Sequence, residues 1–161
     1  MKKESGKLVY QTETAMRYLL LLTLLLSISS CDKKPENFRE QSIAEIRAAE
    51  KAFETMCAEK SVADAFYFYA DSQAVIKREN DTLISGREAI RNYHTSTFYK
   101  TAKVKWAPDF VDASAAGDFG HSYGHYEWTF TDTTGKMMKY PGVYHTVWKR
   151  QKDGSWKYVW D

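Results

Sequence analysis

The stretch Gly117–Asp161, GDFGHSYGHYEWTFTDTTGKMMKYPGVYHTVWKRQKDGSWKYVWD, decides the fold of this 161-residue chain. Aromatic and polar residues alternate along three runs within it, Phe119–Thr131, Gly142–Arg150 and Trp156–Trp160. Such period-2 alternation is typical of β-strands whose two faces meet different surroundings. Turn-forming residues separate the runs, and Asp153-Gly154 is a strong hairpin signal. The sequence therefore predicts an antiparallel meander of three strands.

One face of this predicted meander is strongly aromatic. The first two strands place on it Ser122, Gly124, Tyr126, Trp128, Phe130, Tyr144, Thr146 and Trp148. The other face carries His121, His125, Glu127, His145 and, by continuing the alternation, Asp161. Because exposed aromatic surface is unfavourable in water, the aromatic face needs a cover.

Helical patterns upstream of the meander can supply that cover. Ser42-Ile-Ala-Glu45 resembles a capping box, so a helix with an apolar stripe is expected to begin there. Ser61–Asp64 begins a second, shorter helix, and a third is expected from Gly86 to about Phe98.

Two further strand signals complete the domain. A small hairpin is expected around Asn80-Asp81, and Val104–Ser114 predicts a long strand that is bent at Pro108. Helices followed by a meander favour an α+β fold. We therefore expect a cone-shaped, curved antiparallel β-sheet covered on one face by three N-terminal helices.

The first 30 residues have the pattern of a bacterial signal peptide. The apolar run Tyr18–Ile28 is about half the length of roughly 20 residues that a membrane-spanning helix needs. Arg17 precedes it and small residues follow it, as in a signal peptide, and Met16 is an alternative start. Ile28-Ser-Ser-Cys31 resembles a lipobox, in which the cysteine is lipidated and becomes the new N-terminus.

This leader defines the expected organisation: a signal peptide over 1–30, a polar tether over 31–40 and a domain over 41–161. The predicted location is the bacterial cell envelope, with a lipid on Cys31 as the membrane anchor. The chain has 23 basic and 21 acidic residues, and four and two of these lie in the leader, so the remainder is balanced. Without a clustered basic face, we expect no nucleic-acid partner.

Several short runs resemble the SnoaL-like proteins of unknown function in the nuclear transport factor 2-like superfamily. The matching runs are Gly86–Ile90, Ala116–Gly120, Gly124–Tyr126, Thr146–Lys149 and Asp153–Trp156, with Asp161. Together they span about 41–161. The resemblance implies the nuclear transport factor 2-like, or cystatin-like, fold and a homodimer. Because the superfamily includes ketosteroid isomerase, polyketide cyclases and a kinase assembly module, it implies architecture rather than chemistry.

The aromatic face predicts a pocket for a small hydrophobic or aromatic molecule. Small-molecule sites are mostly apolar, with a few polar groups that orient the ligand. The candidate ligand-binding residues are Tyr67, Tyr69, Tyr126, Trp128, Tyr144 and Trp148. The alternative is that these rings fill a packed core. No cofactor is expected.

The sequence leaves catalysis open. The isomerases that this chain resembles use a pocket carboxylate and a tyrosine. Since Glu127 and Asp161 are expected on the other face, Asp71 and Asp109 are the candidate catalytic carboxylates. Three interpretations therefore remain: a ligand-binding domain, an isomerase-, cyclase- or hydratase-type enzyme, and a dimeric assembly module.

The histidines on the other face raise the question of a metal site. If the hairpin is centred near Gly135, His125 lies opposite His145, with Glu127 on the same face. His121 is four residues from His125, roughly 13 Å along a strand, too far to share a metal. We expect these residues to be structural or to form the dimer interface, and we predict no metal.

Replacing Cys31 with serine tests the anchor, because serine lacks the thiol that accepts the lipid. We expect the variant to leave the detergent phase in a phase-separation assay, whereas the wild type partitions into it. A Cys57→Ser variant serves as the control, since Cys57 is the other cysteine of the chain. Unchanged partitioning of Cys31→Ser would exclude lipidation at this position.

Overall fold

The computed structural model describes residues 38–161. The signal peptide, Cys31 and most of the tether lie outside the described residues. The elements are α2 (Arg39–Glu59), α3 (Val62–Tyr69), β1 (Ala70–Arg78), the 3-10 turn η1 (Glu79–Asp81), β2 (Thr82–Ser85), α4 (Arg87–Tyr93), α5 (Thr97–Thr101), β3 (Lys103–Ala113), β4 (Phe119–Thr131), β5 (Met137–Arg150) and β6 (Trp156–Trp160). None of these helices is long and apolar enough to cross a membrane.

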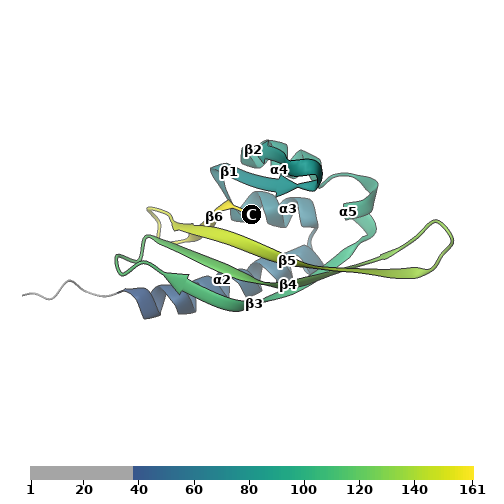
Figure 1. Ribbon diagram of the computed structural model, residues 1–161. Coiled ribbons are helices and arrows are strands. Elements are labelled where there is room, and N and C mark those ends of the chain that lie inside the picture. The colour runs from purple at the N-terminus through teal and green to yellow at the C-terminus, as the bar shows by residue number, and fades with distance from the viewer. Residues whose placement is uncertain (1–37) are drawn as a thin grey trace, which may run out of the picture. The chain divides into compact units, whose positions relative to one another are not determined.

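The six strands form one curved sheet in the order β2-β1-β6-β5-β4-β3 (Figure 1). All neighbouring pairs are antiparallel except β1 and β6, which are parallel. Helix α2 packs against β3, β4 and β6, and α3 lies between α2 and α4. The predicted α+β fold with helices on a curved sheet is confirmed.

The start of the first helix differs from the prediction. Helix α2 begins at Arg39, so Ser42 lies inside its first turn and forms no capping box. Ser42 is instead fully buried, where its Oγ accepts a hydrogen bond from Arg150 Nη2 at 3.1 Å. The second helix starts as expected, because Ser61 Oγ accepts a hydrogen bond from the Asp64 N–H at 3.0 Å.

The third predicted helix is divided in two. Helix α4 ends at Tyr93, and the Thr95 N–H turns back to the Asn92 carbonyl at 3.1 Å. Ser96 is then extended and precedes α5. His94 follows the last residue of α4, and its side chain is buried in the interior.

The expected bend in β3 is present at Pro108. The pairing of β3 with β4 shifts register between Pro108 and Phe110, since proline has no N–H for the ladder. Gly124 lies opposite the bend, and a Cβ there would come within 2.4 Å of the Ala107 carbonyl oxygen. A side chain at Gly124 would therefore block this close approach of β3 and β4.

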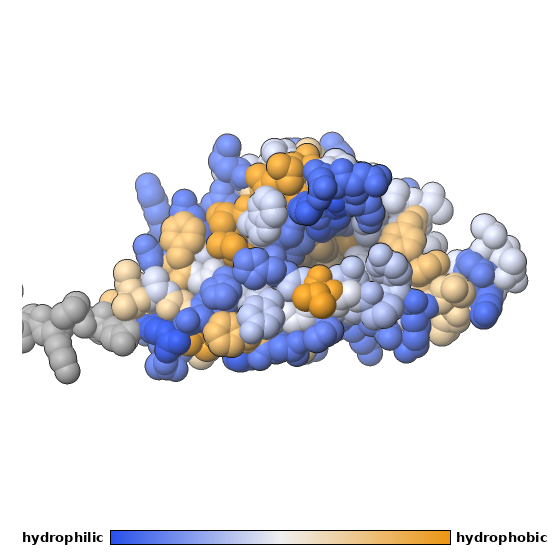
Figure 2. Space-filling view, in the orientation of Figure 1, coloured by the Kyte–Doolittle hydropathy of each residue, from blue (hydrophilic) through white to orange (hydrophobic). Residues whose placement is uncertain are grey.

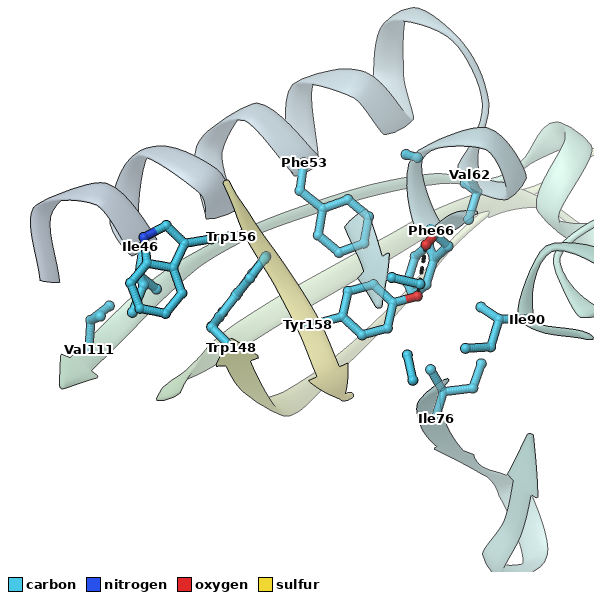
Figure 3. Close-up of a cluster of buried hydrophobic side chains, with 13 residues drawn as sticks. Ile46, Phe53, Val62, Phe66, Ile76, Ile90, Val111, Trp148, Trp156 and Tyr158 are labelled. Atoms are coloured by element: carbon cyan, nitrogen blue, oxygen red, sulfur yellow. Dashed lines mark hydrogen bonds between the residues drawn. The ribbon is translucent and has the colours of Figure 1, made fainter. Parts of the chain in front are cut away.

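Large aromatic side chains pack with smaller aliphatic ones in the core (Figure 3). Phe53 of α2 meets Phe66 edge to face at 4.9 Å and stacks with Tyr158 of β6 at 5.8 Å. The Tyr158 hydroxyl donates to the Phe66 carbonyl at 2.9 Å. Trp148 is fully buried beside Tyr158. These contacts join α2, α3 and the C-terminal strands.

His94 is a polar residue within this core. Its side chain is 2% exposed, and its ring stacks on Phe66 with centroids 4.0 Å apart. Nδ1 lies 2.8 Å from the Ile90 carbonyl oxygen, which only accepts, so Nδ1 carries the proton. Burial first, and then the nearby Arg78, lower the pKa of His94 to about 3. The imidazole is therefore neutral in the folded protein.

We expect His94 to make stability depend on pH. A free histidine has a pKa near 6.5, so between about pH 6.5 and 3 the unfolded chain binds a proton that the folded chain excludes. The free energy of unfolding should therefore fall as the pH falls, by at most about 1.4 kcal/mol per pH unit from this residue. Denaturant unfolding of wild type and His94→Phe at pH 7 and pH 5 measures it, because phenylalanine keeps the ring stacking. Equal pH slopes in the two proteins would contradict this assignment.

Candidate functional site

A cavity of about 500 Å³ lies between the inner, helix-facing side of the sheet and the segment that carries β1, α4 and α5. In the space-filling view the surface is hollowed between that segment and β5 (Figure 2). The inner end is the more polar and the more buried, since Glu50 is 1% and Thr146 2% exposed there. At the outer end Tyr140 is 61% exposed.

Three neighbouring strands supply the aromatic wall of the cavity. Trp106 of β3 pairs directly with Tyr126 of β4, and Trp128 of β4 pairs with Tyr140 of β5. Tyr144 of β5 pairs with Gly124, which lies two residues before Tyr126 on β4 and therefore on the same face of the sheet. Of the predicted ligand-binding residues, Tyr126, Trp128 and Tyr144 line the cavity.

The other three predicted ligand-binding residues lie elsewhere. Trp148 is 0% exposed within the core, and Tyr69 stacks on Phe53 at 4.9 Å. Tyr67 lies on the outside of α3, where its hydroxyl donates to Glu88 at 3.0 Å. Helix α3 buries Val62, Ala65 and Phe66. Tyr67 follows Phe66 directly, so it is rotated away from the buried side of the helix.

Neither predicted catalytic carboxylate lines this cavity. Asp71 accepts hydrogen bonds from the Gln73 N–H at 3.0 Å and from Gln151 Nε2 at 3.2 Å. The Gln73 N–H is the main cause that lowers the pKa of Asp71. Asp109 is exposed beside the β3 bend and pairs with His125 on the outer face at 2.7 Å. Asp71 lies in β1 and Asp109 in β3, and the contacts of both are with neighbouring protein groups outside the cavity.

Glu50 is the buried carboxylate that the cavity does contain. It lies on α2, and its Oε2 accepts from Trp106 Nε1 at 2.7 Å. Its Oε1 accepts from Trp148 Nε1 at 3.1 Å and from the Ser122 hydroxyl in a short hydrogen bond. Burial is the main cause that raises the pKa of Glu50, and the three donors oppose it. A buried carboxyl group in a cavity, with its pKa raised by burial, is a candidate for proton transfer.

Asp161 is a second carboxylate in the cavity, contrary to its expected place on the other face. The pairing of β5 with β6 shifts register between Val147 and Trp148, which breaks the simple alternation. Asp161 consequently accepts from the Thr146 hydroxyl at 3.0 Å and forms an ion pair with Arg78 at 3.0 Å. Both residues of this pair are largely buried.

Two buried polar atoms on the cavity wall have no hydrogen-bond partner within residues 38–161. They are His94 Nε2 and the Tyr144 hydroxyl. Because His94 Nδ1 carries the proton, Nε2 is an acceptor, whereas the tyrosine hydroxyl can donate or accept. Burial, with Glu50 as the next cause, raises the pKa of Tyr144, so this hydroxyl stays protonated.

The outer face of the sheet does not bring together the predicted histidine and glutamate group. His125 lies opposite Val143 rather than His145, because the hairpin is centred at Thr134, one residue before the Gly135 assumed from the sequence, which moves each partner by two residues. His145 Nε2 instead lies 3.3 Å from His121 Nδ1. Within the described part of the chain, no three such side chains are arranged to hold a metal ion.

Sequence reasoning missed Glu50 and His94. A signal for Glu50 exists, since it follows Ile46 by four residues and precedes Phe53 by three on the apolar stripe of α2. A charged residue in that register must find partners across the core. The sequence carries no comparable signal for His94, because its burial depends on where the predicted third helix breaks.

No protein-family profile matches the sequence. No curated protein matches it either. Solved structures do match. A ketosteroid isomerase-like protein from Erwinia carotovora atroseptica has a TM-score of 0.62 at 18% identity, over 74% of this chain and 92% of that one.

Two further structures are similar. An NTF2-like protein with a cystatin-like fold from Novosphingobium aromaticivorans has a TM-score of 0.62 at 16% identity, over 74% of this chain and 79% of that one. The association domain of CaMKII from C. elegans has a TM-score of 0.60 at 17% identity, over 75% of this chain and 95% of that one. The chain therefore has the nuclear transport factor 2-like, cystatin-like fold.

Proposed function

We propose that the domain binds a small, largely aromatic or apolar molecule in the cavity between the sheet and the shorter helices. The observation that carries this proposal is an unfilled volume of about 500 Å³ behind an aromatic wall. Volumes of this order, lined mostly by rings with a few polar groups, are typical of small-molecule sites.

Polar atoms at the inner end can orient the bound molecule. The Tyr144 hydroxyl can donate a hydrogen bond and His94 Nε2 can accept one. Leaving a buried polar atom without a partner costs about 1–3 kcal/mol. A ligand that carries a hydroxyl or carbonyl group would remove that cost, which favours a molecule with one polar end.

A proton-transfer enzyme is the second candidate, favoured by the presence of Glu50 and Tyr144 in one cavity. In such an enzyme Glu50 would accept a proton from a carbon next to a carbonyl, and Tyr144 would donate a hydrogen bond to the carbonyl oxygen. The test is solvent deuterium exchange into a bound ketone, followed by NMR. Exchange that is equal in wild type and Glu50→Gln would remove this candidate.

We also propose that the domain is held at the bacterial cell envelope by a lipid on Cys31. The lipobox-like sequence before Cys31 supports this, together with the polar tether that follows it. An exported binding domain on a short tether would meet its ligand outside the cytoplasm.

A homodimer through the outer face of the sheet is the proposed assembly. Helices cover the inner face, whereas Phe110 and Tyr123 on the outer face stack on each other and remain 40% and 43% exposed. His121 and Val147 flank them. Exposed aromatic residues on a sheet are favourable in a self-complementary interface.

Substitution of two tryptophans, Trp148 and Trp128, distinguishes the effect of core packing from that of ligand binding. Trp148→Ala should lower the free energy of unfolding by about 3–5 kcal/mol, because the ring is fully buried. Trp128→Ala should cost less, because Trp128 is only half-buried, yet it should abolish binding. Thermal melts of both variants and wild type with aromatic and steroid-like compounds measure the two effects. If no compound shifts the wild type, or if Trp128→Ala is shifted equally, the proposed pocket is wrong.

The dimer is tested with Tyr123→Glu, because a charge on an isologous interface occurs twice and repels itself. We expect the wild-type soluble domain, residues 38–161, to sediment as a dimer at micromolar concentration and Tyr123→Glu as a monomer. Lys152→Glu, in the exposed turn before β6, is the matched control and should remain dimeric. A monomeric wild type would contradict the proposal.

A further inference from the structure

The charges on the cavity wall do not balance. Arg78 pairs with Asp161, so these two side chains neutralise each other. Lys77 pairs at 2.6 Å with Asp81 in the exposed turn η1. Within residues 38–161 no lysine, arginine or histidine forms an ion pair with Glu50. The inner end of the cavity therefore has a carboxyl group without a counter-ion.

The three hydrogen bonds to Glu50 favour its ionised form. Both tryptophan N–H groups can only donate, and the Ser122 hydroxyl donates to Oε1. These donors are neutral, so they orient the carboxylate but do not cancel its charge. Burial opposes ionisation and raises the pKa of the carboxyl group. A cation in the cavity would stabilise the carboxylate that the donors are arranged to hold.

Aromatic rings surround the same end of the cavity. Trp106 donates to Glu50 directly, and its cross-strand neighbour Tyr126 lines the wall beside it. Tyr144 completes this group from β5 and lines the same cavity as Glu50. Ring faces attract cations, and the attraction is stronger where water is excluded.

His94, one of the two histidines that line the cavity, does not oppose a cation. His94 is neutral because it is buried, and its unpartnered Nε2 presents a lone pair rather than a proton. The partial charge of this atom is negative, as is that of a tyrosine oxygen. Arg78 is the cation of the inner end, and Asp161 holds it.

We propose that the molecule bound in the cavity is an organic cation, an ammonium group attached to an aromatic or apolar body. The ammonium group lies beside Glu50 and against the faces of Trp106, Tyr126 and Tyr144. The apolar body extends toward Trp128 and Tyr140 at the outer end. This inference rests on the proposed function, because it names the class of ligand for the same cavity.

A pair of probes with the same shape tests the charge alone. They are para-trimethylammonio-benzyl alcohol and para-tert-butylbenzyl alcohol, which differ by a positive nitrogen in place of a carbon. Calorimetric titration of the domain with each probe gives two dissociation constants. We expect the charged probe to bind at least about tenfold more tightly, although it loses more hydration on binding.

Two variants locate the effect. Glu50→Gln keeps the size of the side chain but removes the charge, so the preference for the charged probe should fall at least about tenfold. Because this buried change could unfold the protein, Tyr126→Leu provides a second variant at a half-buried position. It removes a ring face and should weaken the charged probe more than the neutral one. Glu59→Gln, an exposed carboxylate at the C-terminal end of α2 and outside the cavity lining, is the matched control and should leave the preference unchanged.

The outcomes separate the two proposals. Equal or tighter binding of the neutral probe overturns the organic-cation inference and leaves the aromatic pocket standing. A preference for the charged probe that persists in both Glu50→Gln and Tyr126→Leu also overturns it, because other groups would then bind the positive charge. If neither probe binds and no aromatic compound does, the pocket itself is wrong and the inference falls with it.

Discussion

The carboxylate of Glu50 is the contact on which the arrangement of helix and sheet depends. It is carried by α2, and its three donors come from β3, β4 and β5. A carboxylate sealed from water is tolerated only when its oxygens are satisfied, so α2 must lie where all three donors reach it. Apolar packing would allow the helix to slide along the sheet, whereas this network allows one register.

The same contact connects the inner end of the cavity to the core and to α3. Trp148 donates to Glu50 and also packs against Tyr158, and Tyr158 is in turn bonded to the backbone of α3. Removing Glu50 would leave the Trp106 indole N–H without its acceptor, whereas the Trp148 N–H would keep Ser122 Oγ at 3.1 Å. A donor left without a partner in the interior costs about 1–3 kcal/mol, which is a large part of the stability of a small domain.

The aromatic wall depends on glycine as much as on the rings. A Cβ at Gly142 would lie 2.3 Å from the Tyr126 ring, so the ring occupies the space that a side chain would take on the neighbouring strand. Gly124 likewise leaves room where β3 bends. Two positions without side chains, on adjacent strands, therefore fix where the cavity wall turns and where Tyr126 lies.

The sequence predicted the fold from local signals. Alternation identified both faces of β4, and Pro108 identified the bend in β3, because each depends on neighbours along the chain. It placed three cavity residues, Tyr126, Trp128 and Tyr144, on the correct face. It failed for Asp161, whose orientation depends on a register shift between two strands, and for Ser42, whose partner Arg150 is distant in sequence. The inner end of the site is built from such long-range contacts, and local pattern carries no information on them.

Glu50 can hold α2 against the sheet and still contact a bound molecule. An ionised carboxylate offers about four lone-pair sites, and the two indoles and Ser122 use three of them. The group is therefore held in one orientation while retaining capacity for a further contact on the side of the cavity. A carboxylate fixed by neutral donors keeps its charge available, whereas one fixed by an arginine, as Asp161 is, does not. The fold thus distinguishes Glu50 from Asp161 by the charge of their partners, and Glu50 is left able to attract a proton or a cation.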